Sequence, residues 1–208
     1  MASVSFHNIQ KNFGDVKVIH GISFDIQDGE FVVLVGPSGC GKSTLLRIIG
    51  GLQGPSQGKA FYNYDQDRPI PLTDIFQSAS FCAPGMEVVE ELTLREFFEF
   101  HFSFKRAIGG LTVADIINLT GLNTASDKQV GDFSSGMKQR VKLAQAIFSD
   151  TPLLLLDEPC TNLDQQGVDQ YRGWIEKYAA GRLVIVASND EREYFFCTEK
   201  IEIEKYKS

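Results

Sequence analysis

Residues 36–43 read Gly-Pro-Ser-Gly-Cys-Gly-Lys-Ser, which matches the phosphate-binding loop pattern G-x-x-x-x-G-K-S. The apolar run Phe31–Val35 precedes this loop, and a stretch typical of a helix, Ser43–Ile49, follows it. Glycines let the backbone turn tightly enough to aim successive N–H groups at phosphate oxygens, and a helix start adds the positive end of its dipole. We therefore predict that the loop binds phosphate groups. A chance glycine turn is the alternative, and the strand and helix on either side disfavour it.

The loop and the start of the helix supply the expected phosphate and metal ligands. Lys42 offers a mobile cation to terminal phosphates, and the Ser43 hydroxyl can bind Mg²⁺. Cys40 occupies a variable position of the pattern and is expected to be a small filler, not a nucleophile. The predicted nucleotide-binding residues of this segment are Gly36, Pro37, Ser38, Gly39, Cys40, Gly41, Lys42, Ser43 and Thr44.

Length and composition fit a globular protein. The 208 residues suffice for one well-packed domain or two closely joined lobes. The longest apolar runs are strand-sized, far below the ~20 residues of a membrane-spanning helix, and residues 1–6 lack the pattern of a secretory signal. The net charge of −7 argues against nucleic acid as a partner. Four cysteines lack the spacing of metal ligands and are expected to be reduced thiols: Cys40, Cys82, Cys160 and Cys197.

The hydrophobic pattern predicts a parallel α/β sheet with a helical insertion. Strands and helices alternate near both ends of the chain, which is typical of such a sheet. The expected strands are Val4–Ile9, Val16–Ile26, Phe31–Val35, Lys59–Tyr62, Ile75–Cys82, Leu153–Asp157 and Leu183–Ala187. The expected helices after the first one lie within Glu87–Ala114 and over Ala114–Leu119, Ser135–Phe148 and Gln165–Tyr178.

Two carboxylates stand at the end of the apolar stretch Leu153–Leu156. A buried strand would place Asp157 beside the phosphate loop, where Asp157 and Ser43 can hold Mg²⁺. Glu158 points differently and suits a base that polarises water for attack on a γ-phosphate, with Lys42 as the second catalytic residue. Two solvated acids at a strand end are the alternative, and the phosphate loop favours the catalytic interpretation.

The segment Asp-Phe-Ser-Ser-Gly-Met-Lys-Gln-Arg begins at residue 132 and resembles the signature of the ATP-binding cassette (ABC) ATPases, usually Leu-Ser-Gly-Gly-Gln. Ser134 and Gly136 match, whereas Phe133, Ser135 and Met137 depart from it. A serine and backbone amides at a helix start can bind phosphate, so the resemblance implies that Ser134, Ser135 and Gly136 bind nucleotide. A simple serine cap of a helix is the alternative, which the order of the three motifs disfavours.

The resemblance spans Val4 to about Ile203 and implies an α/β fold of the P-loop NTPase class. This fold has a RecA-like parallel-sheet core, an N-terminal antiparallel β subdomain and an inserted α-helical lobe. We expect a single domain over residues 1–208, with a core lobe at about 1–83 and 150–208 and a helical lobe at about 84–149.

The resemblance also assigns roles to single residues. Phe13 matches the aromatic residue that stacks on adenine in the family, with a core position as the alternative. Leu163 and Asp164 match the loop that touches the other cassette in family dimers.

Two positions depart from the family. Pro84 stands where the family has a glutamine that senses Mg²⁺ and the γ-phosphate, and Gln77 has the wrong spacing, so this sensor is expected to be missing. Asn189 stands where the family usually has the histidine of Thr-His-Asp. Its amide can donate a hydrogen bond to the γ-phosphate but cannot carry a proton. We expect hydrolysis led by Glu158, and whether these departures slow it stays open.

The run Phe97–Phe104 is rich in aromatic residues and admits two interpretations. It either forms the core of the helical lobe or is exposed for docking, because the family's groove near the glutamine position receives a short helix of the membrane subunit.

The resemblance implies the ATPase subunit of an ABC transporter, with ATP and Mg²⁺ as cofactors. Two ATP would lie between paired cassettes, in a homodimer or in a heterodimer with another ABC cassette. A separate transmembrane permease subunit would hold the chain peripherally on the cytoplasmic face of the membrane. Two alternatives stay open: an ABC-type regulator that signals across the membrane without transport, and a soluble ABC ATPase outside transport.

Overall fold

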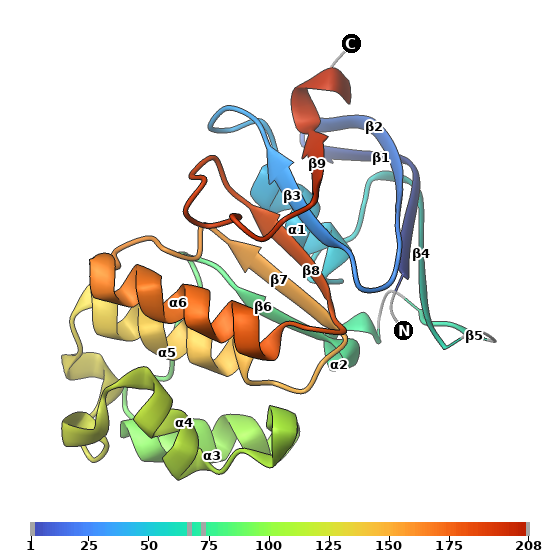
Figure 1. The fold of residues 1–208 in the computed structure, drawn as a ribbon. Coiled ribbons are helices and arrows are strands. Elements are labelled where there is room, and N and C mark those ends of the chain that lie inside the picture. Colours follow the sequence, from blue (N-terminus) through green and yellow to red (C-terminus); the bar gives the residue numbers. More distant parts are fainter. Residues whose placement is uncertain (1–2, 66–67, 72–73, 207–208) are drawn as a thin grey trace. The chain divides into compact units, whose positions relative to one another are not determined.

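The computed structural model describes residues 3–65, 68–71 and 74–206. The chain forms two compact units (Figure 1). The first unit consists of Met1–Phe81, Pro152–Glu158 and Gly181–Ser208, and the second of Cys82–Thr151 and Pro159–Ala180. The second unit thus includes residues beyond 84–149, and the predicted lobe boundaries stay a prediction.

A five-stranded sheet forms the centre of the first unit, in the order β6-β7-β8-β3-β9 (Figure 1). Strand β8 pairs in parallel with β7 and with β3, and β3 pairs in parallel with β9. The carboxyl ends of β7, β8 and β3 therefore lie at one edge. The strands are β3 (Phe31–Val35), β6 (Ala79–Cys82), β7 (Leu153–Asp157), β8 (Leu183–Ala187) and β9 (Glu199–Glu202). All residues of β7 and β8 are buried, as expected for continuous apolar strands of a parallel sheet.

An antiparallel sheet shares the core of this unit, in the order β2-β1-β4-β5. Its strands are β1 (Ser3–Phe13), β2 (Val16–Ile26), β4 (Gln57–Asp65) and β5 (Arg68–Pro69). Helix α1 (Lys42–Ile49) contacts β2 of this sheet and β7 and β8 of the parallel sheet. The Tyr62 hydroxyl donates a hydrogen bond to the Ile48 carbonyl at 2.9 Å, which joins β4 to the helix. These contacts fix the helix that follows the phosphate loop.

The prediction of a strand over Ile75–Cys82 is wrong for the first half of this range. Residues Ile75–Ser78 form the short helix α2, and β6 begins at Ala79. In this single helical turn Ile75 is buried and Phe76 is 54% exposed.

The second unit contains α3 (Leu94–Phe104), α4 (Val113–Thr120), α5 (Ser135–Ile147) and α6 (Gln165–Tyr178). Short 3-10 helices connect them: η1 (Ile108–Gly110), η2 (Asn123–Ala125) and η3 (Val130–Asp132), whereas η4 (Ile203–Tyr206) belongs to the first unit. Helices α5 and α6 pack side by side, and α4 contacts both α3 and α5 (Figure 1).

Helix content expected across Glu87–Ala114 is confined to a shorter range. A capping box starts α3: the Thr93 side chain accepts a hydrogen bond from the Glu96 N–H, and the Glu96 carboxylate accepts one from the Thr93 N–H. These hydrogen bonds lower the pKa of Glu96. Gly109 and Gly110 both have positive φ angles, so the chain turns between α3 and α4.

The aromatic run is buried in one part and exposed in another, and docking by its exposed part stays a prediction. Phe97 and Phe98 are buried, whereas Phe100 is 54% and Phe104 75% exposed. The exposed rings contact each other, with centroids 5.1 Å apart, because they lie four residues apart on α3.

Within the part of the chain that the structure describes, we find no helix with both the length and the apolar character needed to cross a bilayer.

Candidate functional site

The phosphate loop connects β3 to α1, and its conformation requires glycine. Gly36, Gly39 and Gly41 all have positive φ angles. A Cβ atom at Gly41 would lie 2.7 Å from Ile19 Cδ1 and 3.1 Å from Val18 Cγ1. At Gly36 it would lie 2.7 Å from Cys40 Sγ, so the buried Cys40 fills space beneath the loop.

Helix α1 begins without a side-chain cap. Gly41 is its N-cap and provides no side-chain hydrogen bond to the first N–H groups of the helix. N–H groups without such a cap, together with the helix dipole, favour an anion. The loop and helix can therefore hold phosphate.

Lys42 folds over the loop. Its Nζ donates hydrogen bonds to the Gly36 carbonyl at 2.6 Å and to the Pro37 carbonyl at 3.3 Å, and the residue is only 8% exposed. The ammonium group thus sits within the loop, where a phosphate oxygen could replace these carbonyls as its partner.

Ser43 and Asp157 form a pair of oxygen ligands. Ser43 Oγ donates a hydrogen bond to Asp157 Oδ1 at 3.0 Å, and Asp157 is 4% exposed. Burial raises the pKa of Asp157, the hydrogen bond from Ser43 lowers it, and the charge of Glu158 raises it further. A hydroxyl and a carboxylate brought together in this way fit Mg²⁺, which prefers oxygen ligands and completes its shell with water and substrate phosphates.

Replacing Asp157 tests whether burial raises its pKa, because the substitution should change how the melting temperature depends on pH. The raised pKa means that ionising Asp157 opposes folding at pH values above the folded pKa, and that this cost disappears below the unfolded pKa. We expect Asp157→Asn to raise the melting temperature at pH 7, by about 2–4 °C for each kcal/mol regained, and to leave it unchanged at pH 3. Thermal melts of both proteins at the two pH values measure this. A lower melting temperature at pH 7 would contradict it.

Glu158 has an unusual backbone conformation. Its φ angle is +43°, and its N–H donates a hydrogen bond to the Ala187 carbonyl at 3.0 Å. A non-glycine residue in the left-handed region is strained, and such residues are frequent at active sites. The register explains the placement, since Asp157 pairs with Ala187 and the chain then leaves the sheet. The Glu158 side chain is exposed, as a base that meets water must be.

Asn189 reaches the first residue of the phosphate loop. Its Nδ2 donates a hydrogen bond to the Gly36 carbonyl at 2.8 Å, and its Oδ1 accepts one from the Gly36 N–H at 3.2 Å. The sequence did not indicate this paired contact, because it joins residues 153 positions apart. The structure thus brings the loop, Asp157, Glu158 and Asn189 together at the carboxyl edge of the parallel sheet, where ligands bind in such folds.

Phe13 ends β1 and is 48% exposed, so the core alternative does not hold for it. Lys11 Nζ lies 5.2 Å from the centroid of the ring and donates a hydrogen bond to the Gly54 carbonyl at 2.7 Å. An exposed ring of this kind can stack on a base.

The signature segment belongs to the second unit. Ser134 caps α5 by accepting a hydrogen bond from the Met137 N–H at 3.3 Å, so the capping interpretation is correct, and nucleotide binding by this segment stays a prediction. A Cβ atom at Gly136 would lie 3.0 Å from the Asn162 carbonyl, which explains the glycine. A pocket of about 330 Å³ opens here, lined by Ser134, Ser135, Gly136, Met137, Arg140, Asn162 and Asp164.

Polar side chains of α5 bind residues in the loops of the second unit. Arg140 pairs with Asp164 at 3.0 Å, and Asp164 caps α6 through the Gly167 N–H, which is the main cause of its lowered pKa. Gln139, which is 1% exposed, donates a hydrogen bond to the Pro159 carbonyl at 2.7 Å. Lys142 Nζ donates one to the Pro84 carbonyl at 2.9 Å, so the residue at the family's glutamine position contributes backbone only.

Comparison with known proteins agrees with this geometry. The sequence model of the ABC transporter family matches residues 19–161, so the chain belongs to that family. Its fold is that of the ABC ATPases, as the resemblance predicted.

Individual relatives are similar over nearly the whole chain. The maltose/maltodextrin import ATP-binding protein MalK of Salmonella typhimurium is 34% identical over 97% of this chain and 55% of its own length. The spermidine/putrescine import ATP-binding protein PotA of Mycoplasma capricolum is 31% identical over 95% of this chain and 57% of its own length. The chain thus spans little more than half the length of these relatives.

Solved structures show the same fold. The dimeric post-hydrolysis state of the ATP-binding cassette MJ0796, bound to ADP and Pi, has a TM-score of 0.79 and 25% identity, covering 96% of this chain and 93% of that one. The structure of a protein named "putative ABC transporter (ATP-binding protein)" from Pyrococcus furiosus also has a TM-score of 0.79, at 22% identity and 98% coverage of both chains.

Proposed function

We propose that this chain binds and hydrolyses ATP and that it powers transport through a separate transmembrane subunit. The observation that carries the proposal is the convergence of the phosphate loop, Asp157 and Glu158 at one sheet edge. The relatives named above are import ATP-binding proteins, which supports a role in transport.

Each residue has a proposed part in hydrolysis. The loop N–H groups bind the phosphates, and Lys42 exchanges its carbonyl partners for phosphate oxygens. Ser43 and Asp157 would hold Mg²⁺, which neutralises phosphate charge when bound. Glu158 orients a water molecule and takes its proton during attack on the γ-phosphate. The adenine would stack on Phe13.

We propose further that the signature pocket completes the site of a second cassette. Ser134, Ser135 and Gly136 line an open pocket at the start of α5, and such helix starts favour phosphate. Two cassettes, identical or related, would then enclose two ATP molecules, as the dimeric state of one solved relative suggests. ATP would close the pair and hydrolysis would open it, so that the attached membrane subunit moves. Such an attachment would place the chain at the cytoplasmic face of the membrane.

Metal removal tests the enzymatic part of the proposal. We expect the purified chain, with the membrane subunit that copurifies with it, to release phosphate from ATP only while Mg²⁺ is present. Excess EDTA should reduce the rate at least about 100-fold, because the terminal phosphates lose their charge neutralisation, and added Mg²⁺ should restore it. A rate that EDTA leaves unchanged would contradict the proposed site.

A further inference from the structure

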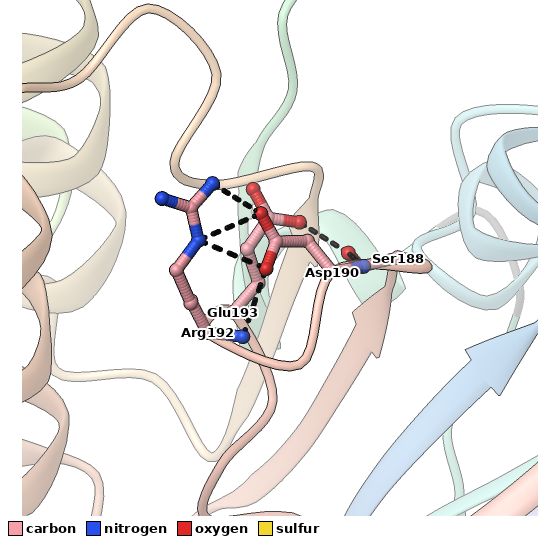
Figure 2. Close-up of polar contacts among 4 residues, drawn as sticks. All are labelled: Ser188, Asp190, Arg192 and Glu193. Atoms are coloured by element: carbon pink, nitrogen blue, oxygen red, sulfur yellow. Dashed lines mark hydrogen bonds and ion pairs between the residues drawn. The ribbon is translucent and has the colours of Figure 1, made fainter.

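The turn that follows β8 is organised by a buried hydroxyl. Ser188, 1% exposed, donates a hydrogen bond from its Oγ to the carboxylate of Glu193 (Figure 2). The same Oγ accepts a hydrogen bond from the Asp190 N–H at 2.9 Å. Glu193 is 4% exposed, and its own N–H donates to the Asp190 carbonyl at 2.9 Å. The turn is thus closed around Ser188 and anchored to a buried acid.

A second pair on this turn lies at the surface. The Arg192 guanidinium binds both carboxylate oxygens of Asp190, at 2.6–3.0 Å, and holds the pKa of Asp190 below its usual range (Figure 2). The two side chains are 60% and 37% exposed. Exposed ion pairs contribute little to stability, so this pair provides a matched comparison for the buried one.

Asn189 lies between Ser188 and Asp190, which these hydrogen bonds hold in place. Its amide binds both polar atoms of the Gly36 backbone, the N–H and the carbonyl. The Gly36 carbonyl also accepts the hydrogen bond from Lys42 at 2.6 Å. When Lys42 turns toward a phosphate, Asn189 can keep this carbonyl satisfied, and the entry of the phosphate loop keeps its shape.

We propose that Glu193 is a positioning residue for the phosphate loop. Through Ser188 it fixes the turn that presents Asn189 to Gly36, and the Asn189 amide then acts on the loop, not directly on the γ-phosphate. This inference rests on the proposed nucleotide site. It differs from the role that the family resemblance suggested for position 189, which was a hydrogen bond to the γ-phosphate.

The two roles predict different nucleotide selectivity. A contact with the γ-phosphate strengthens ATP binding and leaves ADP binding alone. A residue that holds Gly36 shapes the loop for every nucleotide with a β-phosphate, so its loss weakens ATP and ADP by similar factors.

Equilibrium titrations without turnover separate these roles. We expect Asn189→Ala and Glu193→Ala each to weaken both ATP and ADP by about three- to tenfold, the worth of one or two hydrogen bonds. The double variant should lose little more than the larger single loss, because both residues act through the same contact. Glu193→Gln, whose carbonyl can still accept from Ser188, should keep most of the affinity, and Arg192→Ala should change it less than about twofold.

Several outcomes would overturn the proposal. These are wild-type affinity in Glu193→Ala, fully additive losses in the double variant, or a loss confined to ATP. If Glu193→Ala does not fold, Ser188→Ala carries the same prediction, because it removes the hydroxyl while the acid stays. Absence of nucleotide binding in the wild-type chain would instead refute the proposed function itself.

Discussion

Replacing Glu158 with glutamine should reduce ATP hydrolysis about 10²–10⁴-fold while ATP affinity stays within about threefold of wild type. Glutamine has the same shape and keeps the Glu158 N–H bond to Ala187, so the strained turn should persist. It cannot accept a proton from water, which removes general base catalysis and leaves the phosphate contacts unchanged. Phosphate release and equilibrium ATP titration measure the two quantities separately.

An exposed acid of the same unit provides the control for this result. Glu191 is exposed on the turn after β8, so Glu191→Gln removes one carboxylate from the same unit without touching the proposed site. We expect its turnover to equal that of the wild type. Normal turnover in Glu158→Gln would show that another residue activates water.

Replacing Lys42 with alanine should weaken ATP binding about 10- to 100-fold and abolish measurable hydrolysis. The phosphates would lose their cationic partner, because no other side chain of the described loop carries a positive charge there. Lys42→Arg should not restore activity, because the buried position fits a single ammonium and not a planar guanidinium. Nucleotide titration and phosphate release test both statements.

Lys59→Ala serves as the matched control, since Lys59 is an exposed lysine on β4 of the same unit. It should bind ATP as the wild type does. If Lys42→Ala bound ATP with wild-type affinity, the loop would not hold the terminal phosphates.

The sequence identified the elements whose patterns are local. The apolar runs Leu153–Asp157 and Leu183–Ala187 form the predicted strands, because continuous burial in a parallel sheet leaves a continuous apolar pattern. The helix Gln165–Tyr178 has its predicted bounds as well, since Asp164 caps it and its apolar residues share one face. The phosphate-loop glycines were identifiable for the same reason, as their pattern lies within eight residues.

Features that leave no periodic pattern of their own, or that depend on distant contacts, escaped prediction. The helix Ile75–Ser78 is a single turn, too short to leave a periodic pattern. Whether an aromatic residue of α3 is buried depends on which face meets α4, so Phe98 and Phe104 differ although the sequence treats them alike. The contact between Asn189 and Gly36 follows from strand order, because β8 lies beside β3. A single sequence contains no direct signal for the order of strands in a sheet.

The proposed mechanism requires ATP to be held between two cassettes, and mixing two inactive variants tests this requirement directly. Lys42→Ala damages the phosphate loop, and Ser134→Arg fills the signature pocket. Each should be inactive alone. In a mixture, half of the dimers would pair one variant with the other, and each such dimer would contain one intact site, so about a quarter of wild-type turnover should return. Turnover that stays at the sum of the two separate variants would contradict the shared site.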